Sequence, residues 1–434
     1  MAKPKPSDAI NPRTTEYDFS GPVGALASMI FIPINVYLLY YSCSEETGGC
    51  LPKFILDNTV GFFKKEAWWM RLWDTEAAVT YLGWYAFCFA CWMILPGEVA
   101  KGTRLRDGTV KEYKINGFGT FILAIGLAVG SVIKFGPDCM TFLYHKWVGF
   151  ITAALLLALV ESIYVYAMSF RPGKLLALGG NSGNVAYDFF IGRELNPSIG
   201  SFDLMFFNKL RPGLILWALI DISMVCEQAV RRGGFSKITD SMWLTSVFHI
   251  FYVADAIYNE PAILTTIDII ADGLGFMLIV DDLVWVPFTY TMQTRYLAFN
   301  HVELGPIYTT IILALNSLGY WMFRSANVEK NDFRNGKNPK NLKYMTTESG
   351  SKLLISGWWG LSRHPNYIGD ILMAITWSLP TGFSTPITYF YPMFFIPFMM
   401  HRQARDDAWC QKKYGKDWDK YKALVPYKII PYVY

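Results

Sequence analysis

Long apolar stretches alternate with short polar ones along most of the 434-residue chain. Four of the apolar stretches precede residue 170, at positions 21–42, 77–95, 117–133 and 148–169. Each is about long enough, as a helix, to cross a hydrocarbon layer of roughly 30 Å. A polar connection over residues 170–211 follows, the chain re-enters the membrane at Gly213, and residues 305–323 form another uncharged span. The pattern predicts an all-α membrane fold of about ten transmembrane helices.

The last apolar run, residues 371–400, contains no charged side chain. As a single helix it would be about 45 Å long, which exceeds the hydrocarbon layer of roughly 30 Å. We therefore expect the run to bend or break where proline removes a helix donor and clashes with the preceding turn. The candidate places are Pro380, Gly382, Pro386, Pro392 and Pro397.

The segment just before this run, residues 353–370, carries paired indoles, an Arg363-His364-Pro365 break, an amide beside a phenol, and an acid. Irregular polar backbone at a membrane surface is tolerated where it lines a cavity. The sequence thus predicts that this segment forms the floor of a ligand site.

Composition agrees with a polytopic membrane protein, since 53% of the residues are hydrophobic and 17% are charged. The basic residues lie in short loops between spans rather than on one dense face, so we expect no nucleic-acid partner. Their distribution, together with an even number of spans, predicts that both termini are cytosolic. Cys43 and Cys50 could pair in a lumenal loop, whereas Cys88 and Cys91 lie in an apolar run and suit packing.

Several ionisable residues are set into otherwise apolar sequence between positions 243 and 296. One charge at the centre of a membrane helix costs roughly 2.5–3.5 kcal/mol, so a group of them implies a cavity lined by protein and partly wet. Each acid could cap a helix or bond a neighbouring span, and one could be catalytic. No spacing suits zinc, so we expect no metal. The residues are His249, Asp255, Glu260, Asp268, Asp272, Asp281 and Asp282.

A basic stretch follows the span at 305–323, and residues 401–434 then predict a helix and a turn at the cytosolic surface. The basic stretch, residues 324–343, has two interpretations: a loop that obeys the positive-inside bias, or a clamp for phosphate. No glycine-rich strand-to-helix turn is present, so a nucleotide would not be held by a Rossmann unit.

Several motifs of the sequence are specific: Leu354-Ile355-Ser356-Gly357-Trp358-Trp359-Gly360, Arg363-His364-Pro365-Asn366-Tyr367-Ile368-Gly369-Asp370, Gly192-Arg193-Glu194-Leu195-Asn196-Pro197, Asp272-Gly273-Leu274-Gly275 and Asp282-Leu283-Val284-Trp285. On these motifs the chain resembles the sterol reductase family. Within the family, Trp377-Ser378-Leu379-Pro380-Thr381-Gly382-Phe383 and the ending Tyr427-Lys428-Ile429-Ile430-Pro431-Tyr432-Val433-Tyr434 are most similar to the fungal delta-14 sterol reductases. One departure is Asp281, where relatives often carry glycine.

The resemblance implies an enzyme of the endoplasmic reticulum membrane that uses NADPH to saturate the carbon 14–15 double bond of a sterol in ergosterol synthesis. It implies a cytosolic tail (1–20), a bundle with a sterol-side cavity (21–300) and an NADPH-binding region (301–434) whose pocket faces the cytosol. The sterol would enter from the bilayer, and membrane lipids and other enzymes of the pathway are further candidate partners. The implied cofactor contacts are Lys330, Arg334, Leu354, Trp359, Asn366, Tyr367, Arg402, Asp406, Cys410, Tyr414 and Tyr421.

An unactivated olefin must be protonated before it accepts a hydride, so the site also needs an acid and must exclude water. Glu260, Asp272 and Asp281 are the candidate proton donors, with Tyr414 and His249 as weaker ones. Alternative functions are reduction of a delta-7 or 24(28) sterol double bond, a sterol-binding scaffold, and a membrane methyltransferase, whose carboxy-terminal part shares the Arg363 to Tyr367 motif.

Overall fold

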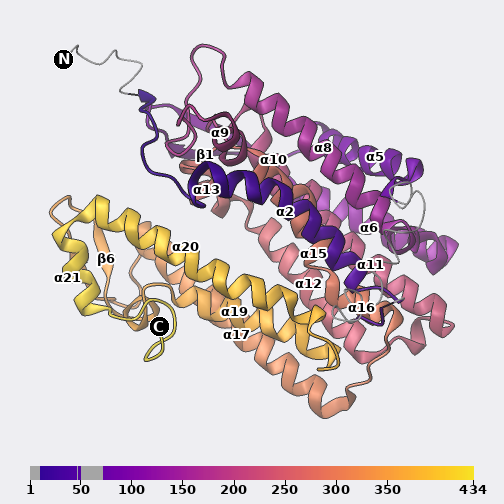
Figure 1. The fold of residues 1–434 in the computed structure, drawn as a ribbon. Helices are drawn as coiled ribbons and strands as arrows, with labels where there is room; N and C mark the ends of the chain where they lie inside the picture. The colour runs from indigo at the N-terminus through magenta and orange to yellow at the C-terminus, as the bar shows by residue number, and fades with distance from the viewer. Residues whose placement is uncertain (1–9, 46, 50–71) are drawn as a thin grey trace. The chain divides into compact units, whose positions relative to one another are not determined.

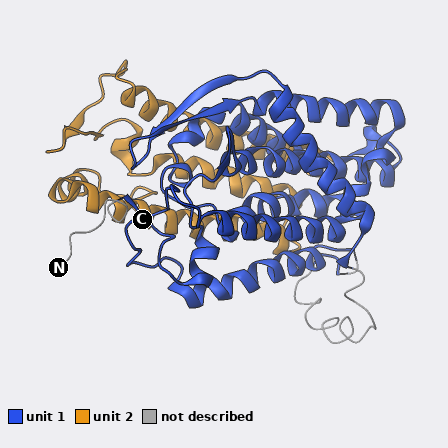
Figure 2. Cartoon of the chain, turned by 90° about the horizontal axis from the view of Figure 1, so that it is seen from above, with its two compact units in different colours: residues 1–238, 246–301 blue, residues 239–245, 302–434 orange. Residues whose placement is uncertain are grey.

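A computed structural model describes residues 10–45, 47–49 and 72–434, and most of these residues are helical (Figure 1). The predicted pairing of Cys43 with Cys50 lies outside the described residues. The chain divides into two compact units (Figure 2). Unit 1 comprises Met1–Ile238 and Ser246–His301, and unit 2 comprises Thr239–Thr245 and Val302–Tyr434.

Among the residues that the structure describes, five helical segments, all in unit 1, are long and apolar enough to cross a membrane. Four agree with the predicted spans to within about two residues at each end, which is the usual uncertainty of a helix boundary. The fifth begins at Leu204, earlier than the re-entry predicted at Gly213, because the last part of the polar connection is already helical. These segments are α2 (Gly21–Ser42), α5 (Thr75–Ile94), α6 (Gly117–Phe135), α8 (Trp147–Met168) and α10 (Leu204–Leu210) followed by α11 (Pro212–Arg232).

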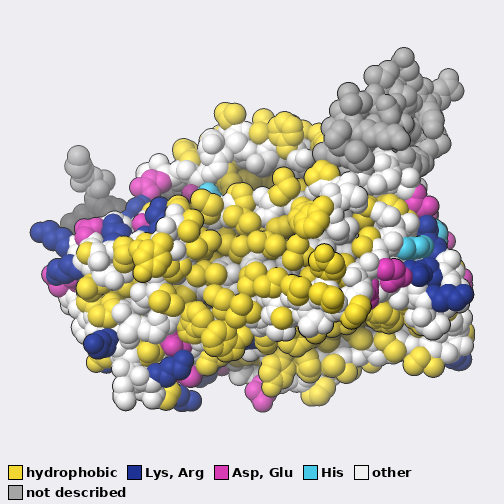
Figure 3. Space-filling view, turned by 90° about the horizontal axis from the view of Figure 1, so that it is seen from below, with side chains coloured by type: hydrophobic (Ala, Val, Ile, Leu, Met, Phe, Trp, Pro, Cys, Tyr) yellow, Lys and Arg dark blue, Asp and Glu magenta, His cyan; other side chains and the backbone are white. Residues whose placement is uncertain are grey.

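Large apolar side chains on these helices are exposed. Val23 in α2 and Ile133 in α6 are each 80% exposed, for example. On the face drawn in Figure 3, hydrophobic side chains cover a broad area and charged side chains gather towards its ends. A large exposed apolar surface is expected where lipid replaces water. The protein is therefore a membrane protein.

Shorter elements complete unit 1. They are β1 (Glu98–Arg104), β2 (Val110–Ile115), η3 (Pro137–Met140), α7 (Phe142–His145), α9 (Val185–Ile191), β3 (Ser198–Ile199), β4 (Phe202–Asp203), η4 (Phe235–Lys237), α12 (Asp240–Tyr258, shared with unit 2), η5 (Glu260–Thr265), α13 (Ile267–Ile270), α14 (Phe276–Val280), the π-helix η6 (Asp281–Trp285), α15 (Val286–Thr289) and α16 (Met292–Phe299).

The connection between α8 and α10 is a satisfied turn rather than a plain loop. The carboxylate of Asp188 accepts hydrogen bonds from the backbone N–H groups of Ser182 and Gly183, at 2.9 Å each. The backbone then passes close to the second glycine motif, because a Cβ atom on Gly192 would lie 2.3 Å from the carbonyl carbon of Gly273. Gly192 also has a φ of 96°, which favours glycine. Two motifs about 80 residues apart thus pack directly against each other.

Unit 2 holds a long helix, two small strands and the carboxy-terminal helices. Its elements are α17 (Gly305–Arg334), β5 (Tyr344–Thr346), β6 (Lys352–Leu354), α18 (Trp358–Leu361), α19 (Pro365–Ser378), η7 (Leu379–Thr381), η8 (Ile387–Tyr389), α20 (Phe390–Tyr414) and α21 (Lys416–Leu424). Strands β1 and β2, β3 and β4, and β5 and β6 form three antiparallel pairs, which the all-α prediction omitted.

The predicted break in residues 371–400 is confirmed between α19 and α20. Pro380, Gly382 and Pro386 lie in this interval. Pro392 and Pro397 were wrong as break sites, because α20 continues through both. Pro392 falls in the first turn, where no N–H partner is needed, and Pro397 is accommodated inside the helix.

Candidate functional site

Helices α17 and α19 approach each other at two glycines. A Cβ atom on Gly369 would lie 2.4 Å from the carbonyl oxygen of Gly319, so a larger residue could not pack there. In the buried part of the same interface, Asn316 Nδ2 donates to Thr376 Oγ1 at 2.8 Å. The close packing fixes the first turn of α19 beside the polar end of α17.

The Arg363-His364-Pro365 break is tied to the end of the chain. The backbone N–H groups of Arg363 and His364 donate to the carbonyl oxygens of Tyr427 and Lys428, at 2.9 and 3.0 Å. The guanidinium of Arg363 also donates to the carbonyl oxygen of Val425 at 2.9 Å. Arg363 therefore has a structural role, since its hydrogen bonds hold the carboxy-terminal segment at the start of α19.

His364 lies between an aromatic ring and an acid. Its ring stacks on that of Tyr367, with centroids 4.8 Å apart, and its Nε2 is 3.6 Å from Asp406 Oδ2. Burial, reinforced by nearby lysine and arginine side chains, lowers the pKa of His364 to about 3. The imidazole is therefore neutral at physiological pH. His364 contacts two of the implied cofactor residues, Tyr367 and Asp406, although it was not itself among them.

Lys330 and Trp359 contact each other directly. Lys330 Nζ lies 3.8 Å from the centre of the Trp359 ring, and the indole N–H donates to the carbonyl oxygen of Ala326 at 2.8 Å. Burial and the neighbouring Arg334 lower the pKa of Lys330 to about 8, against the opposing effect of Asp406. The amine is thus a cation at neutral pH that loses its charge one or two pH units higher.

Asn366 presents a buried hydrogen-bond acceptor. Its Nδ2 donates to Asn327 Oδ1 at 3.2 Å, which joins α19 to α17. Its Oδ1 is buried and has no partner among the described residues. A buried carbonyl oxygen without a partner costs about 1–3 kcal/mol. A ligand with an N–H donor would remove that cost.

Helix α20 carries Arg402, Asp406, Cys410 and Tyr414, four residues apart and so on one face. Arg402 forms a side-chain hydrogen bond with Tyr367, and burial raises the pKa of that phenol to about 12. Asp406 and Cys410 interact electrostatically with Lys330. Side chains from α17, α19 and α20 are therefore brought together.

The remaining implied contacts lie around this group. Arg334 is exposed at the last residue of α17 and interacts electrostatically with Lys330. Leu354 is buried in β6. Tyr421 stacks on Trp418 at 4.9 Å, in a cluster against which Cys410 and Tyr414 pack.

Glu260 is one of the three candidate proton donors, and both of its carboxylate oxygens are engaged. Its side chain is only 1% exposed. Oε1 is 2.7 Å from Nη2 of Arg211, which is itself fully buried, and Oε2 accepts from the backbone N–H of Gly117 at 2.8 Å. Gly117 is the first residue of α6, so the carboxylate completes the amino-terminal end of that helix.

Asp281 opens the π-helix η6, and Asp272 lies just before the glycine motif packed on Gly192. Lys209 makes an ion pair with Asp268 at 2.5 Å and interacts electrostatically with Asp281 and Asp282 as well. One cation thus faces three acids. Single π-turns are frequent at functional sites.

His249, a weaker candidate, is fully buried and pairs with Asp221. Its Nδ1 is 3.2 Å from Asp221 Oδ2, and Thr294 Oγ1 donates to the other oxygen of the same carboxylate at 2.7 Å. Asp221 was not singled out from the sequence. It lies 28 residues before His249, and only the packing of α11 on α12 pairs them.

Comparisons with known proteins support the same family over the whole chain. A model of the ergosterol biosynthesis ERG4/ERG24 family matches residues 13–434. The chain belongs to this family. It is similar to the Delta(14)-sterol reductase erg24 of Schizosaccharomyces pombe, with 46% identity over 98% of this chain and 99% of that protein. It is also similar to the Delta(14)-sterol reductase ERG24 of Candida albicans, with 42% identity over 99% of this chain and 100% of that protein.

A third relative is longer than this chain. The Delta(14)-sterol reductase LBR of Gallus gallus is 41% identical over 96% of this chain, which is 64% of that protein. Membership of the ERG4/ERG24 family confirms the resemblance that the motifs gave.

Proposed function

We propose that this protein is a delta-14 sterol reductase, which saturates the carbon 14–15 double bond of a sterol intermediate in ergosterol synthesis. The observation that carries this proposal is the 46% identity with a Delta(14)-sterol reductase over nearly the full length of both chains. Such coverage includes both units, so the relationship is not confined to a shared cofactor-binding part.

The cofactor we propose is NADPH, and the residues of unit 2 fit it. Lys330 and Arg334 offer cations for phosphate. The unpartnered Oδ1 of Asn366 suits the N–H donors of a carboxamide, and Asp406 suits ribose hydroxyl groups. When bound, NADPH supplies the hydride. Leu354, Trp359, Tyr367, Arg402, Cys410, Tyr414 and Tyr421 complete the proposed contacts.

The side chains of this protein must supply a proton and exclude water. A proton added at carbon 15 leaves a tertiary cation at carbon 14, and that cation is the form of the sterol that accepts a hydride. Apolar walls protect the cation from water. The acid must therefore hold its proton at neutral pH beside the sterol.

Among the three candidate donors, we favour Asp281. Asp268, Asp281 and Asp282 all interact electrostatically with Lys209, so the three acids lie near one another, and like charges close together favour retention of a proton by one of them. Glu260 suits a structural role better, because Arg211 and the start of α6 already use both of its oxygens. Asp272 remains the second choice.

We place the enzyme in the endoplasmic reticulum membrane, with both termini in the cytosol and about ten spans. In this arrangement residues 1–20 form a cytosolic tail, residues 21–300 the sterol side, and residues 301–434 the NADPH side, whose pocket faces the cytosol. The sterol enters from the bilayer. Membrane lipids surround the bundle, and other enzymes of the sterol pathway are the protein partners we propose.

An assay of membranes that contain the expressed chain tests the proposal. They receive NADPH and, in separate reactions, a sterol with a 14–15, a delta-7 or a 24(28) double bond, and products are read by mass spectrometry. We expect reduction of the 14–15 double bond. Reduction of only another double bond would reassign the substrate, and sterol binding without any reduction would favour a scaffold.

The NADPH affinities of two asparagine variants test the proposed cofactor site. Asn366→Ala removes the buried amide, and we expect NADPH to bind roughly tenfold or more weakly, the equivalent of one buried hydrogen bond of 1–3 kcal/mol. Asn331→Ala removes an exposed amide from α17 and should leave the NADPH affinity unchanged. Equal affinities of the two variants would contradict the site.

A further inference from the structure

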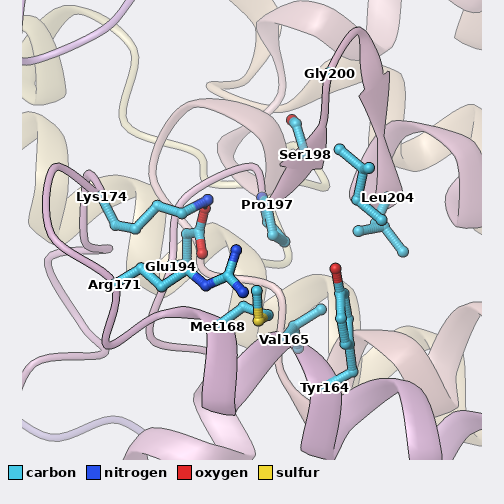
Figure 4. Close-up of a pocket in the computed structure, with 11 residues that line it drawn as sticks. Tyr164, Val165, Met168, Arg171, Lys174, Glu194, Pro197, Ser198, Gly200 and Leu204 are labelled. Carbon is cyan, nitrogen blue, oxygen red and sulfur yellow. Dashed lines mark hydrogen bonds and ion pairs between the residues drawn. The ribbon is translucent and has the colours of Figure 1, made fainter.

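A cavity of about 260 Å³ lies at the end of α8 in unit 1, beside Glu194 and Pro197 of the Gly192–Pro197 motif (Figure 4). Tyr164, Val165 and Met168 of the last turns of α8 line one side of it. Arg171, Lys174 and Glu194 lie together on another side (Figure 4). The cavity thus combines an apolar wall with a charged one.

The charged wall carries two cations, Arg171 and Lys174, and one acid, Glu194. Lys174 Nζ forms an ion pair with Glu194 Oε1 at 2.7 Å. Arg171 is exposed, and within the described part of the chain no carboxylate pairs with its guanidinium. An arginine fork at the mouth of a cavity suits a phosphate group.

Glu194 adds a second requirement for the ligand. Its side chain is 5% exposed, and its Oε2 is buried without a hydrogen-bond partner in the described residues. A buried carboxylate oxygen in that state accepts a hydrogen bond from a hydroxyl or N–H group of a ligand. The cavity therefore offers one site for an anion and one for a donor.

The outer face of α8 leads from the membrane to this cavity. Val160, Ile163 and Tyr164 are 62%, 54% and 40% exposed, and their spacing puts them on one side of the helix. Arg171 follows three residues after the end of this membrane-length helix, at the depth where lipid headgroups lie. An acyl chain could lie along the apolar face while its headgroup reaches the cavity.

The size of the cavity limits its occupant. Pockets that enclose drug-sized ligands are roughly 300–1,000 Å³. A cavity of about 260 Å³ is smaller, so it suits a headgroup better than a rigid sterol body.

We propose that this cavity binds the headgroup of an anionic glycerophospholipid that carries hydroxyl groups. Arg171 binds the phosphate, the free oxygen of Glu194 accepts from a headgroup hydroxyl, and the acyl chains lie on α8. The argument for this lipid site does not rest on the proposed reductase function.

Native mass spectrometry of the full-length protein in detergent tests this proposal. The protein is titrated with dioleoyl phosphatidylinositol, with dioleoyl phosphatidylcholine and with soluble inositol phosphate. We expect saturable binding of phosphatidylinositol alone. Arg171→Gln should weaken it roughly tenfold, the equivalent of one charge-assisted hydrogen bond. Lys101→Gln removes an exposed cation from β1 and should leave the affinity for phosphatidylinositol unchanged.

Three results would overturn the proposal. Equal binding of the two lipids would remove the need for the anionic polyol headgroup. Equal affinity of the soluble inositol phosphate would make this a site for a free phosphate ester rather than for a lipid. Equal binding by both variants, with unchanged thermal unfolding, would remove Arg171 from the site.

Discussion

At the scale of single residues, Lys330 changes its charge close to physiological pH, because burial lowers its pKa to about 8. If its ammonium group binds phosphate, the affinity for NADPH falls as pH rises and the amine becomes neutral. We expect roughly tenfold weaker binding at pH 9 than at pH 7, from the fraction of protonated amine. Calorimetric titration across this range measures the effect.

Lys330→Arg provides the matched control for that titration. Arginine keeps its charge throughout the range, so the affinity of this variant should hardly change between pH 7 and pH 9. Parallel pH profiles for the two proteins would show that another group causes the dependence.

Glu260 offers a second test at a single residue. Glu260 forms an ion pair with Arg211, and both side chains are buried. Loss of one partner of such a pair costs about 3–5 kcal/mol, so Glu260→Gln should unfold at a clearly lower temperature. Glu112→Gln changes an exposed acid on β2 and should shift stability by no more than about 0.5 kcal/mol. A Glu260→Gln protein with normal stability but no turnover would instead make Glu260 the proton donor.

At the scale of elements, the contact between α17 and α19 holds the candidate cofactor site together. Gly369→Ala would force a methyl group against the backbone of Gly319, and we expect a loss of about 1–3 kcal/mol of stability together with weaker NADPH binding. Gly126→Ala in α6 meets open space and should be neutral or stabilising by up to about 1 kcal/mol. Thermal unfolding measures both. Similar melting temperatures for the two variants would contradict the close packing.

Hydropathy and proline chemistry predicted some elements and missed others. The long spans followed from hydropathy and length. The break followed from the charge-free run being longer than the bilayer is thick, and the positions of Pro380 and Pro386 located it. Helix α20 was harder to predict, because polarity changes at His401 while the helical backbone continues to Tyr414. The strand pair β1 and β2 was also missed, since its exposed residues show little alternation of polarity.

At the scale of the whole molecule, the site depends on contacts between side chains that are far apart in the sequence, and the pattern of hydrophobic and polar residues could not predict these contacts. The cofactor residues came from the resemblance, and the structure brings Lys330, Tyr367, Arg402, Asp406 and Cys410 together across three helices. His364 was in the quoted motif, yet its contact with Asp406 depends on tertiary packing. The sequence left open whether Glu260 caps a helix, bonds a neighbouring span or is catalytic, and it could not identify the partner Arg211, which lies 49 residues away.

An isotope experiment that follows hydrogen from the cofactor to the sterol tests the proposed reduction step by step. The full-length protein in membranes receives a 14–15 unsaturated sterol and NADPH deuterated at its hydride position, and the product is analysed by mass spectrometry and NMR. We expect one deuterium at carbon 14 and a solvent-derived hydrogen at carbon 15. Deuterium at carbon 15, or saturation without any transfer from NADPH, would contradict the proposed reduction.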